Sequence, residues 1–239
     1  MHHRYPKTLR WDADVEQTGP LCIFPGENLK KYHRFQHLYI FLLYPLFLLN
    51  WLFVRDFRDF FSTKRVVRKV LKIPAEEYLN LIVFKSFYLL LIIGVPVFID
   101  RANLLQAFTG LLMMTVTGSL LGRVILLTPH INEDNIFPDT DENSKFHESW
   151  FRQQFLTTND IKENNWFVRH VMGNFNYHLC HHLFPGISSV YAPEVTQVIE
   201  KFAHENSLPY RSLTLTEALG KHYRLIYKNA QFARREYLI

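Results

Sequence analysis

The stretch LIVFKSFYLLLIIGVPVFI, residues 81–99, carries one charge, Lys85, in an otherwise apolar run. A second apolar run occupies residues 104–128, with Arg123 near its far end. A helix needs about 20 mainly apolar residues to cross a bilayer, and both runs reach that length. Only Asp-Arg-Ala-Asn, residues 100–103, separates them. The two runs therefore predict a membrane hairpin with a tight turn.

An earlier apolar run, LYIFLLYPLFLLNWLFV, occupies residues 38–54 and is interrupted by Pro45. The segment before it, residues 30–35, is amphipathic. A proline in mid-run and an amphipathic approach favour a helix lying in the membrane interface over one that crosses. The alternative for all three runs is buried core helices of a soluble protein. Such helices carry a polar stripe, and these runs show little of one.

The basic residues orient the hairpin. Those between the first two runs are Arg55, Arg58, Lys64, Arg65, Arg68, Lys69 and Lys72. The chain after residue 128 is again rich in Lys and Arg. By the positive-inside tendency, residues 55–79 and the C-terminal segment face the cytoplasm. Topology explains the basic stretch, which is therefore weak support for nucleic-acid binding.

Composition removes several classes of protein. The chain has 239 residues, 12 His and two Cys, Cys22 and Cys180, so a disulfide scaffold and a Cys-rich zinc site are excluded. The pI of about 9.1 permits nucleic acid or an anionic membrane surface as partner. The mean hydropathy of −0.07 averages apolar runs with polar chain. We find no dinucleotide-binding glycine motif and no Walker loop.

The C-terminal segment, residues 131–239, is expected to form short helices on the membrane face. Pro-Glu-Val at 193 begins a stretch of helical apolar spacing that runs to residue 204. A second helix is expected from 215 to about 227, with Thr214 or Thr216 as its N-cap.

The motif NFNYHLCHHLFP, residues 174–185, contains His178, His181 and His182. Positions i, i+3 and i+4 share one face of a helix, so the three imidazoles can point into one site. Converging neutral imidazoles suit a transition metal such as iron, zinc or copper. The alternative, three unrelated surface histidines, is disfavoured by their clustering.

The remaining histidines are less informative from spacing alone. His2 and His3 adjoin the start of the sequence, and by themselves they indicate no site. His130 follows the second hairpin run, where it is either a ligand or a helix-end residue. His33 and His37 lie four apart and fit an amphipathic, interface-lying stretch better than ligation. The isolated histidines are expected to be surface or structural: His147, His170, His204 and His222.

A site built from several imidazoles beside a membrane hairpin points to one kind of chemistry. Non-haem iron in an open, nitrogen-rich site can activate dioxygen. A membrane location implies a lipid as the molecule attacked. Removal of hydrogen from an unactivated methylene is beyond any acid–base side chain, so a metal is expected to carry that step.

NFNYHLCHHLFP resembles the third histidine box of the membrane fatty acid desaturase family, in the branch with linoleoyl-CoA and front-end desaturases. The stretch HHRY at 2–5, with DAD at 12–14 and HRFQHLY after it, resembles the end of the second box and the segment beyond that box. Residues 129–138 are similar to the family's piece after its last membrane helix. FLTT at 155 and LPY at 208 also fit, so the resemblance covers 1–239 as one desaturase domain, its C-terminal part.

The resemblance implies an all-α fold of multi-pass membrane helices with a cytosolic helical cap that carries a histidine-box di-iron site. The residues that match family ligands to the two irons are His2 and His3 of the second box, His130 after the hairpin, and His178, His181 and His182 of the third box.

The implied activity is that of a fatty acyl desaturase, an oxidoreductase that uses O2 and external electrons to put a double bond into an acyl chain. The chain would be linked to CoA or to a lipid. The electrons would come from a separate donor of cytochrome b5 or ferredoxin type. We expect an integral, multi-pass membrane protein with its histidine boxes on the cytoplasmic side, and no nucleic-acid partner.

The sequence departs from the family pattern in ways that keep alternatives open. The first box, the first hairpin and the first histidine of the second box are missing, which predicts an N-terminally truncated member with few ligands for two irons. His178 stands where front-end members commonly have Gln, and Cys180 where they often have Glu. The alternatives are a related di-iron lipid hydroxylase and a non-catalytic membrane protein. A soluble zinc protein is disfavoured by the hairpin.

Overall fold

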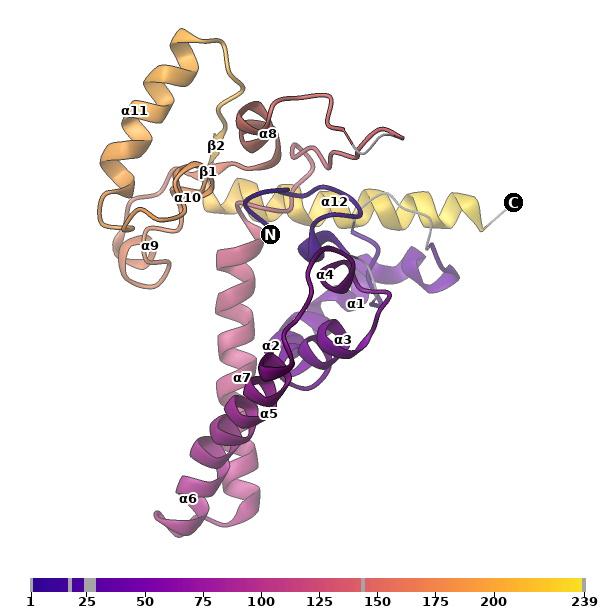
Figure 1. The fold of residues 1–239 in the computed structure, drawn as a ribbon, viewed down its shortest axis with the longest axis vertical. Coiled ribbons are helices and arrows are strands. Elements are labelled where there is room, and N and C mark those ends of the chain that lie inside the picture. Colours follow the sequence, from indigo (N-terminus) through magenta and orange to yellow (C-terminus); the bar gives the residue numbers. More distant parts are fainter. Residues whose placement is uncertain (1, 17–18, 24–28, 143–144, 238–239) are drawn as a thin grey trace. The chain divides into compact units, whose positions relative to one another are not determined.

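The computed structural model describes residues 2–16, 19–23, 29–142 and 145–237. The chain forms two compact units, which are described one at a time. The first joins residues 1–40 to 123–239, and the second is residues 41–122. Figure 1 labels their helices and strands. The described residues are mostly helical with one pair of very short strands, as the predicted all-α class requires.

The unit of residues 41–122 is made of helical segments. In chain order its elements are the end of α1 (Gln36–Leu43), η3 (Tyr44–Leu46), α2 (Phe47–Asn50), η4 (Trp51–Arg55), α3 (Asp56–Phe61), α4 (Val66–Val70), α5 (Ala75–Leu89), η5 (Leu90–Gly94), α6 (Val95–Phe98) and most of α7 (Leu104–Leu127). η3 is a 3₁₀ turn, and η4 and η5 are π-helical.

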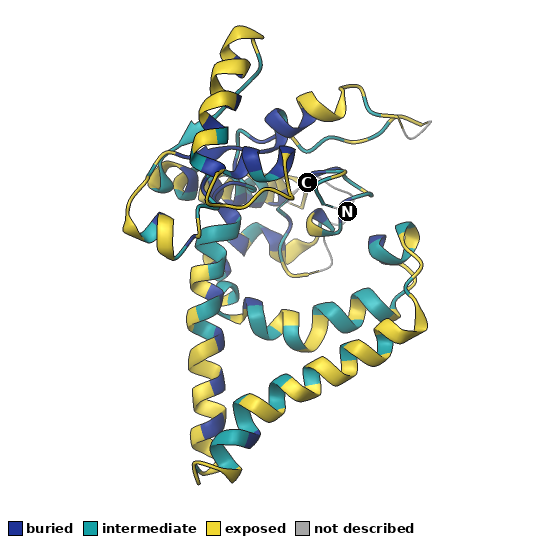
Figure 2. Cartoon of the chain, turned by 60° about the vertical axis from the view of Figure 1, so that its left-hand side comes forward, coloured by how far each residue is buried: buried dark blue, intermediate teal, exposed yellow. Residues whose placement is uncertain are grey.

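Three helical stretches of the described chain are long and apolar enough to cross a membrane. They are Lys31–Val70, Ala75–Phe98 and Leu104–Leu127. Figure 2 shows that most of the surface of α5 and α7 is exposed or only partly buried, which fits helices that would lie in lipid. The interfacial placement of residues 38–54 stays a prediction.

The turn of the hairpin lies between α6 and α7. Arg101 adopts a positive φ of 58°, which reverses the chain there. The Asn103 side chain accepts from the Gln106 backbone N–H at 2.9 Å, and the Gln106 side chain accepts from the Asn103 N–H at 2.9 Å. This reciprocal pair satisfies backbone donors that the first turn of α7 would otherwise leave free.

Pro45 bends its run without ending it. A proline removes one backbone donor and disturbs the helix around it. η3 forms at this point, and the Leu48 N–H donates to Ser119 Oγ of α7 at 3.0 Å. A Cβ on Gly118 would lie 2.9 Å from Leu48 Cδ1, so glycine allows α2 to approach α7 closely.

The unit of residues 1–40 and 123–239 holds all the histidines of interest. Its elements are η1 (Ala13–Val15), η2 (Lys31–Phe35), the start of α1, the end of α7, α8 (Trp150–Thr157), β1 (Asp160–Ile161), α9 (Trp166–His170), α10 (His178–Leu183), α11 (Ala192–Glu205), β2 (Ser212–Leu213) and α12 (Leu215–Glu236). α10 packs between α8 and α11. The core there consists of Phe155, Leu179, Cys180, Leu183, Ala192, Ile199 and Ala203.

The structure confirms the helix expected at 193–204, which is α11, and the N-cap at Thr214, whose side chain accepts from the Glu217 N–H. The expected end of the last helix near residue 227 is wrong, because α12 continues to Glu236. The buried residues of α12 keep a helical spacing as far as Ala230 and Ala233. The helix therefore has a longer buried face than the short helix expected there. The parallel pair β1–β2 was not expected.

Ion pairs join α12 to the segment that follows α7. Arg224 pairs with Glu133 at 2.8 Å, Lys228 pairs with the same carboxylate, and Lys221 pairs with Asp134. Between these pairs, His222 is buried and its Nδ1 lies 2.7 Å from the Ile131 carbonyl oxygen.

His222 should make the stability of this unit depend on pH. Burial lowers the pKa of His222 to about 4, and Arg123 and Lys7 act in the same direction. The unfolded chain takes up a proton as the pH falls below about 6.5, while the folded chain resists until about pH 4. Stability is therefore lost as the pH falls through that window, by about 3 kcal/mol for this residue.

Thermal unfolding of the wild type and of a His222→Gln variant between pH 7.5 and 4.5 measures this effect. The variant keeps a side-chain donor but cannot titrate, so its melting temperature should fall less steeply with pH. Parallel curves for the two proteins would contradict the assignment.

Candidate metal centre

α10 presents the histidines of the motif predicted at residues 174–185. Its first turn is anchored by Asp160, whose Oδ1 accepts from the Leu179 N–H at 2.8 Å. His178 and His182 are buried, and His181 is partly exposed. As the i, i+3, i+4 spacing predicted, the three imidazoles point into one region, with ring centroids between 4.6 and 6.0 Å apart.

Asp160 itself is buried and has a second partner. Its Oδ2 accepts from the Tyr210 hydroxyl at 2.9 Å, and its backbone N–H donates to the Arg211 carbonyl. Burial raises the pKa of Asp160 to about 7. This carboxyl therefore joins the start of α10 to the chain that leads into β2.

His2 and His3 lie in a turn that closes on Asp12. The Asp12 carboxylate accepts from the Lys7 N–H at 2.8 Å, from the Asp14 N–H at 3.0 Å and from His2 Nδ1 at 2.7 Å. The turn brings His2 to 5.0 Å from His182 and His3 to 4.5 Å from His181, between ring centroids.

His130 closes the cluster from the end of α7. The Asn135 side chain donates to its carbonyl oxygen at 2.9 Å, which fixes the backbone there. His130 Nδ1 lies 3.1 Å from His178 Nε2, and the His130 ring lies 4.9 Å from that of His2. One nitrogen each of His2, His130 and His182 all fall within 4.8 Å of one another.

The structure thus brings together all six predicted ligands, from three separate segments. Three of their ring nitrogens are buried and have no hydrogen-bond partner in the described part of the chain: His2 Nε2, His178 Nδ1 and His182 Nε2. A buried nitrogen without a partner costs free energy. Imidazole nitrogens grouped in this way fit iron or another borderline transition metal.

Two residues outside the predicted set orient these rings. Asp12 accepts from His2 Nδ1, and the buried Gln154 of α8 places its Oε1 3.1 Å from His182 Nδ1. A proton on each Nδ1 leaves each Nε2 lone pair free, the usual arrangement of a metal-bound imidazole and its outer partner. Only weak signals in the sequence marked these two outer partners. Asp12 lies in the stretch DAD at 12–14 that resembles the family, and Gln154 is merely the second of two consecutive glutamines.

Burial and mutual proximity favour the neutral form of four of these rings, those of His3, His130, His178 and His182. Burial lowers the pKa of His130, His178 and His182 well below 6.5, and the neighbouring histidines lower it further. Burial and the nearby His181 and His2 lower the pKa of His3 to about 4. Neutral imidazoles have the lone pairs that a metal needs.

The other histidines have other surroundings. His33 is buried, and its Nδ1 accepts from the Lys30 N–H at 3.0 Å. His37 packs its ring on Tyr227. Of the four isolated histidines expected to be surface or structural, three are exposed, His147, His170 and His204, and His222 is buried.

Comparison with known proteins gives a consistent result. The family model described as "Fatty acid desaturase" matches residues 1–214. The chain is 28% identical to the "Acyl-lipid (8-3)-desaturase" of Physcomitrium patens over 93% of this chain and 47% of that protein. It is 26% identical to the "sn-1 linoleoyl-lipid 6-desaturase" of Arthrospira platensis, over 93% and 60%.

A third relative, the "Delta(5) fatty acid desaturase A" of Dictyostelium discoideum, is 27% identical over 95% of this chain and 50% of its own length. The chain therefore spans about half the length of the curated relatives it matches. No solved structure matches it. With a family model covering most of its length and the motif histidines gathered into one cluster, the chain belongs to the fatty acid desaturase family.

Proposed function

We propose that this chain carries the histidine cluster of a membrane fatty acyl desaturase that uses O2 and external electrons at a pair of irons. The observation that carries the proposal is the meeting of six imidazoles, three of them with buried nitrogens that have no partner in the described chain. The proposed ligands are His2, His3, His130, His178, His181 and His182.

The protein's part in this chemistry is to hold neutral nitrogens in place. Asp12 and Gln154 fix the Nδ1 proton of His2 and His182, so that Nε2 of each ring is available. Burial lowers the pKa of His182 and so keeps that ring uncharged at neutral pH. Iron held by such nitrogens would supply the oxidising power to remove hydrogen from an unactivated methylene.

The proposed substrate is an acyl chain in a membrane. Three helices of the described chain are apolar enough to cross a bilayer, and relatives are named acyl-lipid desaturases. The apolar helices support an acyl chain within a membrane, and the relatives' names favour one carried on a lipid over one carried on CoA. The basic residues near the spans support a multi-pass topology with the histidines on the cytoplasmic side. The electron donor would be a separate protein of cytochrome b5 or ferredoxin type.

The test is expression of the chain in a host that supplies polyunsaturated lipids, followed by iron analysis of the purified protein and mass spectrometry of the host's acyl chains. The proposal expects bound iron and a new double bond. Hydroxylated acyl chains would indicate a related lipid hydroxylase instead. Membrane insertion without stoichiometric iron would contradict the proposal and support a non-catalytic protein.

Gln154 should control metal affinity without being a ligand. A Gln154→Leu substitution removes the acceptor at His182 Nδ1 and frees the ring to take the other tautomer. Loss of such an outer partner lowers metal affinity by about 10- to 100-fold. Competition with a chelator of known iron affinity measures the change.

Gln153 offers a matched control one residue away. It is also buried, but its side chain donates to Thr8 Oγ1 at 3.2 Å, whereas the hydrogen bond of His182 Nδ1 in the described chain is made with Gln154. Gln153→Leu should therefore leave iron affinity within a factor of about two. Equal losses in the two variants would mean that α8 acts only through folding.

A further inference from the structure

One face of α5 is polar, although this helix is a candidate membrane span. Two of its polar residues, Glu77 and Asn80, precede the apolar run at 81–99. The run taken by itself therefore showed little of a polar stripe. Lys85 and Tyr88 continue the same face, which extends about 16 Å along the helix axis. Polar side chains are costly within a membrane and are usually functional there.

α3 lies over this face within the same unit. Lys85 Nζ is 2.9 Å from Asp56 Oδ2, and the two side chains are only 13% and 29% exposed. Nearer the start of α5, the Tyr78 hydroxyl donates to the Phe60 carbonyl at 3.1 Å. The two helices are therefore held at two points.

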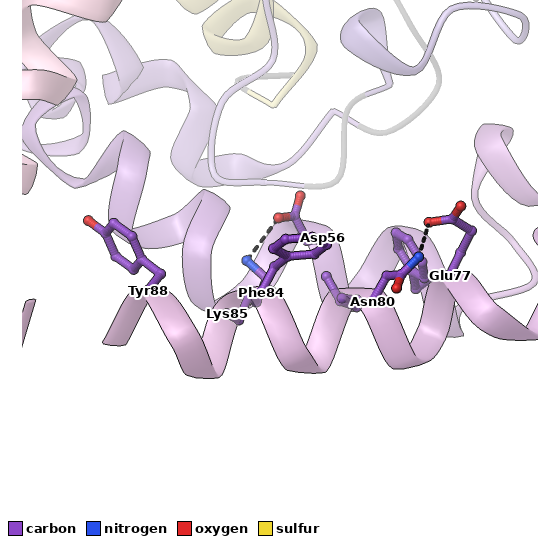
Figure 3. A pocket seen from close by; sticks show the side chains of 8 residues that line it. Asp56, Glu77, Asn80, Phe84, Lys85 and Tyr88 are labelled. Carbon is purple, nitrogen blue, oxygen red and sulfur yellow. Dashed lines mark hydrogen bonds and ion pairs between the residues drawn. The ribbon is translucent and has the colours of Figure 1, made fainter. Parts of the chain in front are cut away.

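Between these helices lies a shallow groove, open to its surroundings, of about 340 Å³. Figure 3 shows the labelled side chains of α5 along one side of that helix, with Lys85 reaching Asp56 of α3 and Asn80 reaching Glu77. The lining combines charged groups with an amide and apolar or aromatic side chains. It has the two carboxylates of Asp56 and Glu77, the ammonium of Lys85, the amide of Asn80, and four apolar or aromatic side chains that include Phe84 and Tyr88.

This combination defines the ligand chemistry. Aromatic faces beside carboxylates attract an organic cation, especially a quaternary ammonium. The Lys85 ammonium has three donors, and its pair with Asp56 leaves others for a phosphate oxygen. Because two carboxylates outnumber one ammonium, a headgroup with negative charge alone is disfavoured.

We infer that this groove binds the headgroup of a zwitterionic phospholipid, with its ammonium toward Glu77 and the aromatic rings and its phosphate toward Lys85. The inference rests on the membrane placement proposed above, but not on the metal or the reaction. A competing explanation is that the Asp56–Lys85 pair only fastens α3 to α5. Substitutions of Glu77 and Phe84 distinguish the two explanations, because both residues line the groove and neither belongs to the Asp56–Lys85 pair.

The test uses the full chain in detergent, titrated with dioleoylphosphatidylcholine or dioleoylphosphatidylglycerol, with retained lipid counted by native mass spectrometry. We expect one phosphatidylcholine per chain at concentrations where phosphatidylglycerol is not retained. Glu77→Gln and Phe84→Ala should each weaken retention by about fivefold or more. Phe87→Ala is the matched control, because Phe87 is exposed on the same helix and does not line the groove.

Circular dichroism of each variant establishes that the helices persist. Equal retention of the two lipids by the wild type would overturn the inference, as would unchanged retention in both groove variants. Extraction of the wild type from membranes by alkaline carbonate would refute the membrane placement and the inference together. Iron content is not read in this experiment, so its result is independent of the metal proposal.

Discussion

A His182→Ala variant is expected to bind iron with an affinity about tenfold or more below that of the wild type. The His182 ring contacts His2, His3, His130 and His178, and its buried Nε2 has no partner in the described chain. Its removal therefore takes away a central nitrogen and loosens the rings around it. Metal analysis of the detergent-purified chain gives the result directly, and any desaturation should fall to background.

His204→Ala is the control, because His204 is exposed on α11 and belongs to no cluster. It should keep the iron content of the wild type. His181→Ala, at the partly exposed edge of the cluster, should also lose iron. If the His181 and His182 variants both kept iron and product formation, the ligand assignment would be wrong.

An Asp160→Ala substitution should produce the largest loss of stability. It leaves the Leu179 N–H and the Tyr210 hydroxyl without their buried acceptor. Each buried polar group left unpaired costs about 1–3 kcal/mol, so a total near 3 kcal/mol is expected. Thermal unfolding in detergent, followed by circular dichroism, measures the change.

A Tyr210→Phe substitution separates the contributions of the two hydrogen bonds to Asp160. It removes one hydrogen bond but keeps the acceptor at the first turn of α10, so the loss should be about 1 kcal/mol. The Phe variant should still bind iron, while the Ala variant should bind it poorly because α10 is no longer held. Equal stability of Asp160→Ala and the wild type would show that α10 is anchored elsewhere.

Local patterns predicted much of the candidate site. The spacing of His178, His181 and His182 determines which face of a helix they occupy, and such a relation depends on few neighbours. The grouping of these three residues with His2, His3 and His130 was predicted only from the resemblance to a known family. No local pattern links residues so far apart in the chain.

The outer partners could not be predicted because they depend on tertiary contacts. Gln154 meets His182 only because α8 packs on α10, and the two residues are 28 positions apart. Asp12 reaches His2 through a turn in which Lys7 and Arg10 have positive φ, a conformation that lysine and arginine seldom adopt. The length of α12 was also missed, although its buried positions keep a helical spacing to Ala233, because those positions are small alanines whose packing partner, η2, lies far away in the chain.

The discontinuity of the histidine-bearing unit has a consequence for the order of assembly. Contacts between its two chain segments join residues about 200 positions apart: Gln36 with Ile226, Asn229 with Ile23 and Tyr237 with Leu29. During synthesis, residues 41–122 leave the ribosome before α12 exists, and domains generally fold as their chain emerges. The contacts of the first segment with α12 can therefore form only after residues 215–236 have been made, long after residues 23–36 have emerged.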